Sequence, residues 1–231
     1  VRSSAASDVY KRQIIYMYTE AFGRASYLVS RSRGKKSTVS KALFIPLSVL
    51  EMEVEHLNKR DLHRIKETRI CFPLNDVCCD PVKNVLALFL SEVLFRVVKD
   101  TEPDPRLFDY LYESIHLLEY ADKGIANFHM VFLLGLLHHL GIFPNMESHR
   151  VGYYFDMLNG VFTDHIPMHR HYLNKVESAF FSRLLRISFE NMSLYGFSRQ
   201  ERVRIIHRIL EYYRLPVSYT HLRAHETEAD L

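Results

Sequence analysis

The densest group of chemically active side chains in this 231-residue chain is cationic. Between Gly23 and Lys41 the sequence holds six Lys or Arg residues in nineteen positions and no Asp or Glu. They are Arg24, Arg31, Arg33, Lys35, Lys36 and Lys41. Such a density of guanidinium and ammonium groups neutralises phosphates, so the segment predicts a surface that binds a polyanion.

Two further cations and several aromatic residues add to this prediction. Arg64 and Lys66 lie two positions apart, so on a strand they would share one face. Tyr16, Tyr18 and Tyr27, together with Phe22, are candidates to stack on nucleobases. Packing in a hydrophobic core is the alternative for each ring, and a solvated surface loop is the alternative for the cations.

Histidines suggest a rival chemistry. They are crowded between residues 149 and 171, as His149, His165, His169 and His171. The spacing His-x3-His-x-His could hold zinc with a fourth ligand. Pro167 interrupts it, however, and the region has no cysteine pair of the zinc-knuckle type. We therefore expect solvated surface histidines and neither a metal nor another cofactor.

A second basic cluster follows near the end of the chain, at Arg199, Arg202, Arg204 and Arg208. Cations at a helix N-terminus oppose the helix dipole, so helix stability does not explain these residues. They could meet an acidic partner, or form a solvated face balanced by Glu201 and Glu211.

Signatures of catalysis are absent from the sequence. Gly34-Lys35-Lys36-Ser37 lacks the upstream glycine of a phosphate loop, and Lys36 stands where Ser or Thr should follow the Gly-Lys pair. There is no HExxH or GxSxG motif. Acidic residues flank Cys78-Cys79, which disfavours a reactive thiolate. We expect a protein that is not an enzyme.

Composition limits the remaining classes. The chain is 48% hydrophobic with a net charge of only +3, which indicates a folded protein and excludes a general polycation. Three cysteines form no disulfide framework and no stretch could span a membrane, so we expect a cytoplasmic protein. Residues 1–13 and 216–231 resemble non-native tails, and we leave them out of the functional argument.

The elements that must position these residues change type once along the chain. Residues 14–75 predict strands, most clearly at Leu50–Glu55, where apolar residues alternate with glutamates on a solvated face. Residues 76–215 predict helices, with Asp80-Pro81 and Asp104-Pro105 as N-terminal caps. We expect helices at 81–99, 105–120, 125–140, 173–194 and 199–213, with an irregular insertion or small hairpin module at 142–172.

The order of several segments resembles the RecO family of recombination proteins, in the form found in Bacteroidetes. The resemblance covers residues 14–215. The segments are IIYMYTEAFGRASYLVSRSRGKKS, ALFIPLSVLEMEVEH, DPVKNVLALFLSEVLFR, FDYL at 108–111, IANFH at 125–129, GVF at 160–162 and FSRQER at 197–202. This resemblance implies an α+β protein of two domains. The first is an OB-fold-like β-barrel at 14–75, here without its first strand, and the second is an all-α helical domain at 76–215 with the small irregular insertion.

The resemblance also implies a function. A family member binds single- and double-stranded DNA, anneals complementary strands, and acts with RecR to load RecA onto DNA covered by single-strand-binding protein. Many members carry a four-cysteine zinc element in the helical domain, which this chain lacks, since no cysteine follows Cys79. The alternative from the residues alone is a protein-interaction scaffold whose surface charge is incidental.

Overall fold

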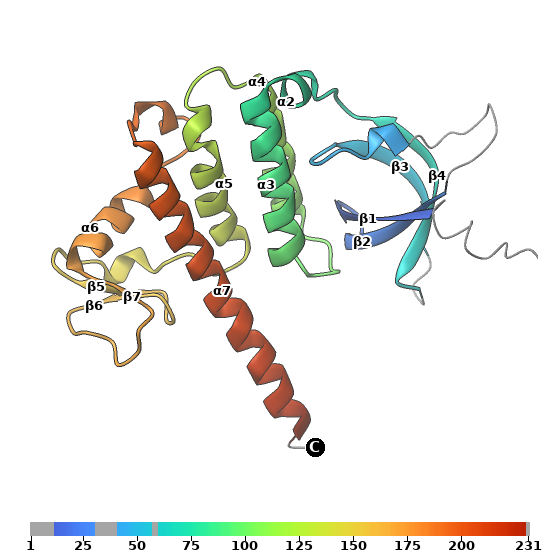
Figure 1. Cartoon of the computed structure of the whole chain (residues 1–231). Helices are drawn as coiled ribbons and strands as arrows, with labels where there is room; N and C mark the ends of the chain where they lie inside the picture. Colours follow the sequence, from blue (N-terminus) through green and yellow to red (C-terminus); the bar gives the residue numbers. More distant parts are fainter. Residues whose placement is uncertain (1–11, 31–40, 57–59, 230–231) are drawn as a thin grey trace, which may run out of the picture. The chain divides into compact units, whose positions relative to one another are not determined.

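The computed structural model describes residues 12–30, 41–56 and 60–229, with side chains at 13–29, 42–56 and 60–215 (Figure 1). The chain divides into two compact units, Val1–Tyr120 and Ala121–Leu231. The first unit thus extends beyond the predicted change from strands to helices, because it also includes the first helices of the chain.

The first unit contains a four-stranded sheet. Its strands are β1 (Arg12–Thr19), β2 (Gly23–Ser30), β3 (Leu50–Glu55) and β4 (Leu62–Ile70). They lie in the order β1-β2-β4-β3, and β2 and β4 are parallel while the other pairs are antiparallel. Closure into a barrel was expected and is wrong for the described residues, because β1 and β3 form the two edges of an open sheet and do not pair.

The alternation predicted at Leu50–Glu55 is confirmed. Leu50, Met52 and Val54 are half-buried, and the three glutamates between and after them are exposed. A register shift between Glu53 and Val54 places Lys66 as the extra residue of β4, since Glu53 is opposite Glu67 and Val54 is opposite Ile65. A short 3-10 helix, η1 (Lys41–Leu43), precedes β3.

Three helices complete the first unit: α2 (Asn75–Cys79), α3 (Pro81–Val97) and α4 (Pro105–Tyr120). Both predicted caps are confirmed. The Asp80 carboxylate accepts hydrogen bonds from the backbone of Val82 and Lys83 at 2.7 and 3.1 Å. Asp104 accepts in the same way from residues 106 and 107. These caps satisfy amides that have no partner inside the helix.

Helix α2 was not predicted, and buried polar contacts hold it. The Glu119 carboxylate, at the end of α4, accepts from the backbone N–H of Asp76 and Val77 at 2.8 and 3.0 Å. Lys83 is only 3% exposed, and its Nζ donates to the Glu119 carbonyl at 2.6 Å and to Asp76 Oδ2 at 3.3 Å. One buried network therefore joins α2, α3 and α4.

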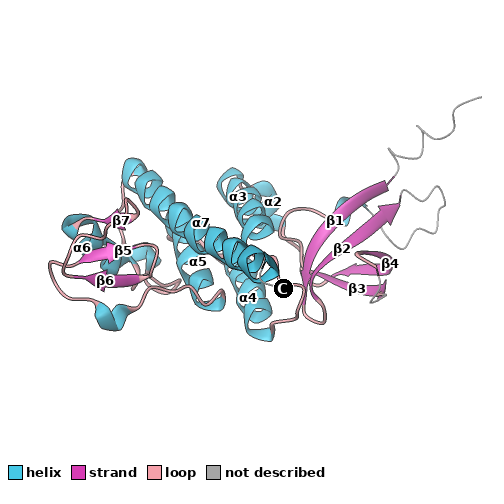
Figure 2. Ribbon diagram, turned by 90° about the horizontal axis from the view of Figure 1, so that it is seen from below, coloured by secondary structure: helices cyan, strands magenta, loops and turns pink. Residues whose placement is uncertain are grey.

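The second unit packs helices with a small sheet (Figure 2). Its helices are α5 (Ile125–His139), α6 (Lys175–Leu184) and α7 (Arg199–Ala229). The strands β5 (Tyr154–Asp156), β6 (Val161–Thr163) and β7 (Tyr172–Leu173) form an antiparallel sheet in the order β6-β5-β7. The irregular insertion or small hairpin module expected at 142–172 is this sheet, which extends to Leu173 and is preceded by the 3-10 helix η2 (Met146–Ser148). The domain is therefore not all-α.

Two helix ends also differ from the prediction. Helix α6 stops at Leu184, and turns and the 3-10 helix η3 (Met192–Leu194) follow it. Helix α7 continues past Pro216, where a stop was expected. Tyr213, on α7, donates its hydroxyl hydrogen to the Leu133 carbonyl of α5 at 2.5 Å, which ties the two helices together. No helix in the described part of the chain is long and apolar enough to cross a membrane.

Candidate nucleic-acid interface

The core of the predicted cationic segment lies outside the described residues. This applies to Arg31, Arg33, Lys35 and Lys36. Strand β2 ends at Ser30, and the next described element, η1, begins at Lys41. The contribution of these four side chains to DNA binding, and that of Lys41, stays a prediction.

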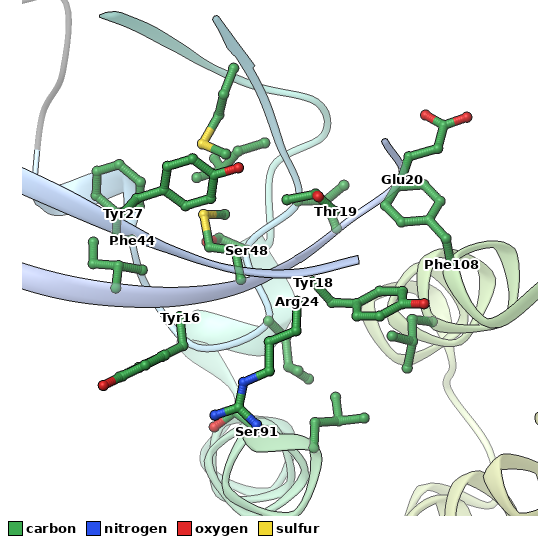
Figure 3. Close-up of a pocket in the computed structure, with 18 of the residues that line it drawn as sticks. Tyr16, Tyr18, Thr19, Glu20, Arg24, Tyr27, Phe44, Ser48, Ser91 and Phe108 are labelled. Atoms are coloured by element: carbon green, nitrogen blue, oxygen red, sulfur yellow. The ribbon is translucent and has the colours of Figure 1, made fainter. Parts of the chain in front are cut away.

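Arg24 is described, and its guanidinium is engaged within the protein. Nη1 donates to the carbonyl oxygens of Phe95 and Val98 at 3.0 and 2.8 Å, at the C-terminal end of α3. The Arg24 Cζ lies 4.7 Å from the Phe95 ring centroid and 5.6 Å from that of Tyr16. Figure 3 shows the side chain reaching from the sheet toward the helix that carries Ser91. A cation at this place satisfies helix carbonyls and complements the helix dipole, so Arg24 ties β2 to α3.

Arg64 and Lys66 are both exposed on β4, as their spacing predicted. The pairing register sets Arg64 opposite Glu55 of β3. Lys66 Nζ lies 3.3 Å from Glu53 Oε1, and Arg69, further along β4, lies 2.8 Å from Glu67. Lys66 and Arg69 therefore each lie beside a carboxylate that offsets their charge. Ion pairs this exposed contribute little to the stability of the protein.

Sequence reasoning missed Arg60, which lies just before β4. Arg60 and Arg64 line one hollow of about 290 Å³, together with Leu28, Glu55, Leu62 and His63. The signal was present in the sequence, because Lys59, Arg60, Arg64 and Lys66 fall within eight positions. The glutamates at 51, 53 and 55 come just before these cations, so the region as a whole is not strongly basic in sequence.

The three candidate stacking residues occupy different environments. Tyr27 is completely buried, so its ring packs in the core. Tyr18 is half-buried, and its hydroxyl donates to the Asp104 carbonyl at 3.4 Å and accepts from the Asp104 N–H at 3.3 Å. Burial raises the pKa of the Tyr18 hydroxyl. Tyr16 is 51% exposed and makes an edge contact with Phe95 at 4.9 Å between ring centroids. Of the three rings, Tyr16 thus offers the most surface to a base.

A continuous stack of rings crosses the sheet beside the hollow. Phe22 stacks on His56, and His56 stacks on His63, with ring centroids 3.9 Å apart in both cases. His63 then lies 5.9 Å from Tyr27. Burial, followed by the neighbouring His56, lowers the pKa of His63, so its imidazole is neutral at pH 7.

An apolar cavity of about 580 Å³ lies within the first unit (Figure 3). Its wall includes residues of β1, of the segment before β3, of β3 itself, and of α3 and α4. Representative lining residues are Tyr16, Tyr18, Phe44, Met52, Phe95 and Phe108. The cavity therefore adjoins both edge strands of the open sheet.

The four histidines considered as zinc ligands, all in the second unit, do not converge on one point. His169 Nε2 lies 3.1 Å from Asp156, and His171 Nδ1 lies 3.6 Å from Glu211, without hydrogen-bond geometry. His165 contacts Asp164, and His149 packs edge-on against Phe162. Among the residues that the structure describes, no group of three or more His, Cys, Asp or Glu side chains could hold a metal ion. The alternative of a zinc site has no support from this geometry.

Two of the four arginines of the second basic cluster are engaged within the protein. Arg208 bonds Glu177 at 2.7 Å and Glu211 at 2.9 Å, and the bond to Glu177 raises the pKa of the guanidinium. Arg202 donates to the Phe197 carbonyl. Arg199 and Arg204 are exposed. The predicted capping box is confirmed, since Ser198 and Glu201 exchange hydrogen bonds of 2.7 and 3.2 Å.

The fold and the site together define a two-unit α+β protein with arginines displayed on an open sheet. Residues 79–223 match the family model described as Recombination protein O C terminal. The chain is 42% identical over 203 residues to the DNA repair protein RecO of Bacteroides fragilis, covering 87% of this chain and 84% of that protein. It is 40% identical over 202 residues to RecO of Azobacteroides pseudotrichonymphae, with the same coverage. It is 36% identical over 218 residues to RecO of Porphyromonas gingivalis, covering 93% and 88%. The chain belongs to the RecO family.

Proposed function

We propose that this protein acts in DNA repair as a non-catalytic recombination mediator. It binds single- and double-stranded DNA through its first unit and anneals complementary strands. It acts with RecR to load RecA onto DNA covered by single-strand-binding protein. The observation that carries this proposal is the similarity, along most of the chain, to proteins named DNA repair protein RecO.

The sheet topology supports an OB-fold as the DNA-binding element. An OB-fold is a five-stranded, partly open barrel. The order β1-β2-β4-β3, with β2 and β4 as the parallel pair, leaves β1 and β3 as the edges that one more strand would join. The apolar cavity beside both edges is where the inner face of that strand would pack.

The distribution of charge supports nucleic acid as the ligand. Phosphates are neutralised by cations whose position matters more than the net charge of the protein. The cations at 31–41 follow β2 in the sequence, and Arg64 lies on the strand that pairs with β2.

Fluorescence titration of labelled single-stranded DNA at several salt concentrations tests the proposal. If about five phosphates are neutralised, the slope of log K against log salt should be about −3.5. Replacing Arg31, Arg33, Lys35 and Lys36 together by Ala should flatten the slope markedly. A matched variant that removes four exposed cations of the second unit, Arg170, Lys175, Arg186 and Arg199, should change it much less. Salt-independent or absent binding would instead favour the protein-interaction scaffold.

The proposed partners require a separate assay. RecA filament formation is followed by its ATPase activity on single-stranded DNA that is already covered by single-strand-binding protein. We expect the lag to shorten when this protein and RecR are added together, and not with either alone. A lag that is unchanged by the pair would contradict the mediator role while leaving DNA binding intact.

A further inference from the structure

We propose that Arg60 and Arg64 form a phosphate subsite, in which one phosphodiester group of a bound strand is held in the hollow at the start of β4. This inference rests on the proposed function and names residues that carry it. The hollow has a volume of about 290 Å³, which is ample for one phosphate group.

Backbone pairing brings the walls of this hollow together from three strands. Strand β2 pairs with β4 in parallel, which sets Leu28 beside Arg64 and Tyr27 beside His63. Strand β3 pairs with the other side of β4 and sets Glu55 beside Arg64. Arg64 therefore lies on a central strand, so its position is determined from both sides.

The two arginines of the hollow differ from the other exposed cations of the same strand. Lys66 and Arg69 each lie within ion-pair distance of a glutamate, at 3.3 and 2.8 Å. Within residues 13–29, 42–56 and 60–215, whose side chains are described, no carboxylate makes such a contact with Arg60 or Arg64. Guanidinium groups without a carboxylate partner can bind a phosphate through paired N–H donors.

Apart from Glu55 and the two arginines, the residues that line the hollow carry no charge. Leu28 and Leu62 are apolar, and His63 is a buried, neutral ring. Because burial lowers the pKa of His63, that ring adds no charge at pH 7, and the arginines supply the positive charge.

Glu55 is the one carboxylate among the residues that line the hollow. Its removal should change DNA affinity in the direction opposite to removal of an arginine. Two arginines and one glutamate leave a net charge of about +1, with His63 neutral. Glu55 repels a phosphate, so Glu55→Gln should tighten DNA binding. A merely structural role of the arginines would not predict this gain.

The experiment compares variants of the full chain in the titration with labelled single-stranded DNA. Arg60→Ala and Arg64→Ala should each weaken binding about tenfold at low salt, the size expected for a lost charge-assisted hydrogen bond. The double variant should reduce the salt slope by about 0.7, which corresponds to one phosphate. Arg69→Ala is the matched control on the same strand and should leave both quantities nearly unchanged. Glu55→Gln should strengthen binding a few-fold.

The measurements separate a failure of the subsite from a failure of the proposed function. If the unaltered chain binds DNA but Arg60→Ala and Arg64→Ala behave like Arg69→Ala, the proposed function stands and the subsite is wrong. If the unaltered chain shows no salt-dependent DNA binding, the proposed function fails, and titration with inorganic phosphate decides the subsite separately. Arginine side-chain NMR signals should then shift at residues 60 and 64 before residue 69. Equal or absent shifts would contradict the subsite.

Discussion

Charged side chains are used differently in two regions of this molecule. In the second unit, Arg208 is held between Glu177 and Glu211, and both bonds are shorter than 3 Å. In the first unit, Arg60 and Arg64 share a hollow without an ion pair among the described residues. Whether a cation already has a partner thus distinguishes charges that hold the fold from charges available to a ligand. Removing a paired charge should cost stability in proportion to its burial, and removing an unpaired one should cost binding.

The largest effect is expected at Lys83, the most deeply buried paired charge. Lys83→Ala removes the bonds from Nζ to the Glu119 carbonyl and to Asp76. The free energy of unfolding should fall by about 3 kcal/mol, because the buried Glu119 carbonyl loses its charged donor, while Asp76 is largely exposed. Urea unfolding of the full chain measures this loss. A loss below about 1 kcal/mol would show that burial does not govern the cost.

A pH-dependent effect of similar size is expected at His129 in the second unit. Burial, and then the charge of Arg202, lower the pKa of His129 from 6.5 to about 4. Because the folded state resists protonation, the contribution to stability is complete above pH 6.5 and is lost as the pH falls toward 4. The loss should be on the order of 3 kcal/mol. Unfolding at pH 7 and pH 4.5 should show a smaller difference for His129→Gln, and an unchanged difference would contradict this.

A smaller effect is expected at Arg208. Its side chain is half-exposed, so Arg208→Ala should reduce the free energy of unfolding by at most about 1 kcal/mol. DNA affinity should stay the same within twofold, since Arg208 is already paired. Urea unfolding and the DNA titration report the two quantities. A tenfold loss of DNA affinity would remove the distinction between paired and unpaired cations.

The smallest effect is expected at Lys66, which forms an exposed pair with Glu53. Lys66→Ala should change stability by no more than about 0.5 kcal/mol. Its effect on DNA binding should lie below that of Arg64→Ala, although both residues are exposed on β4. Equal losses of DNA affinity for Lys66→Ala and Arg64→Ala would show that pairing with a glutamate does not reduce the contribution of a cation to DNA binding.

Local signals in the sequence predicted much of the fold. The caps at Asp80 and Asp104 were visible because each stands directly before a proline and binds amides within three residues. The exposed face of β3 followed from strict alternation. Helix α2 was missed because it has only five residues, and its N-terminal amides are capped by Glu119 from more than forty positions away.

The candidate site was predicted less completely. Arg64 and Lys66 were recognised, whereas the register shift beside Lys66 that leaves Arg69 on an exposed position could not be read from alternation. Arg24 stood in a cationic run, yet its guanidinium is bonded to carbonyls of α3, more than seventy residues away. Tyr27 had the same local surroundings as exposed tyrosines, and only packing shows that it is buried.

The amino-acid sequence by itself determined the starts of α3 and α4 and the alternation of β3, because caps and periodicity act over a few residues. It also determined the family, since the order of many short segments persists along the chain. Only the tertiary structure decided which cations have partners and which face a hollow. Those outcomes depend on strand order and on contacts between distant residues, and no local pattern of residue types records them.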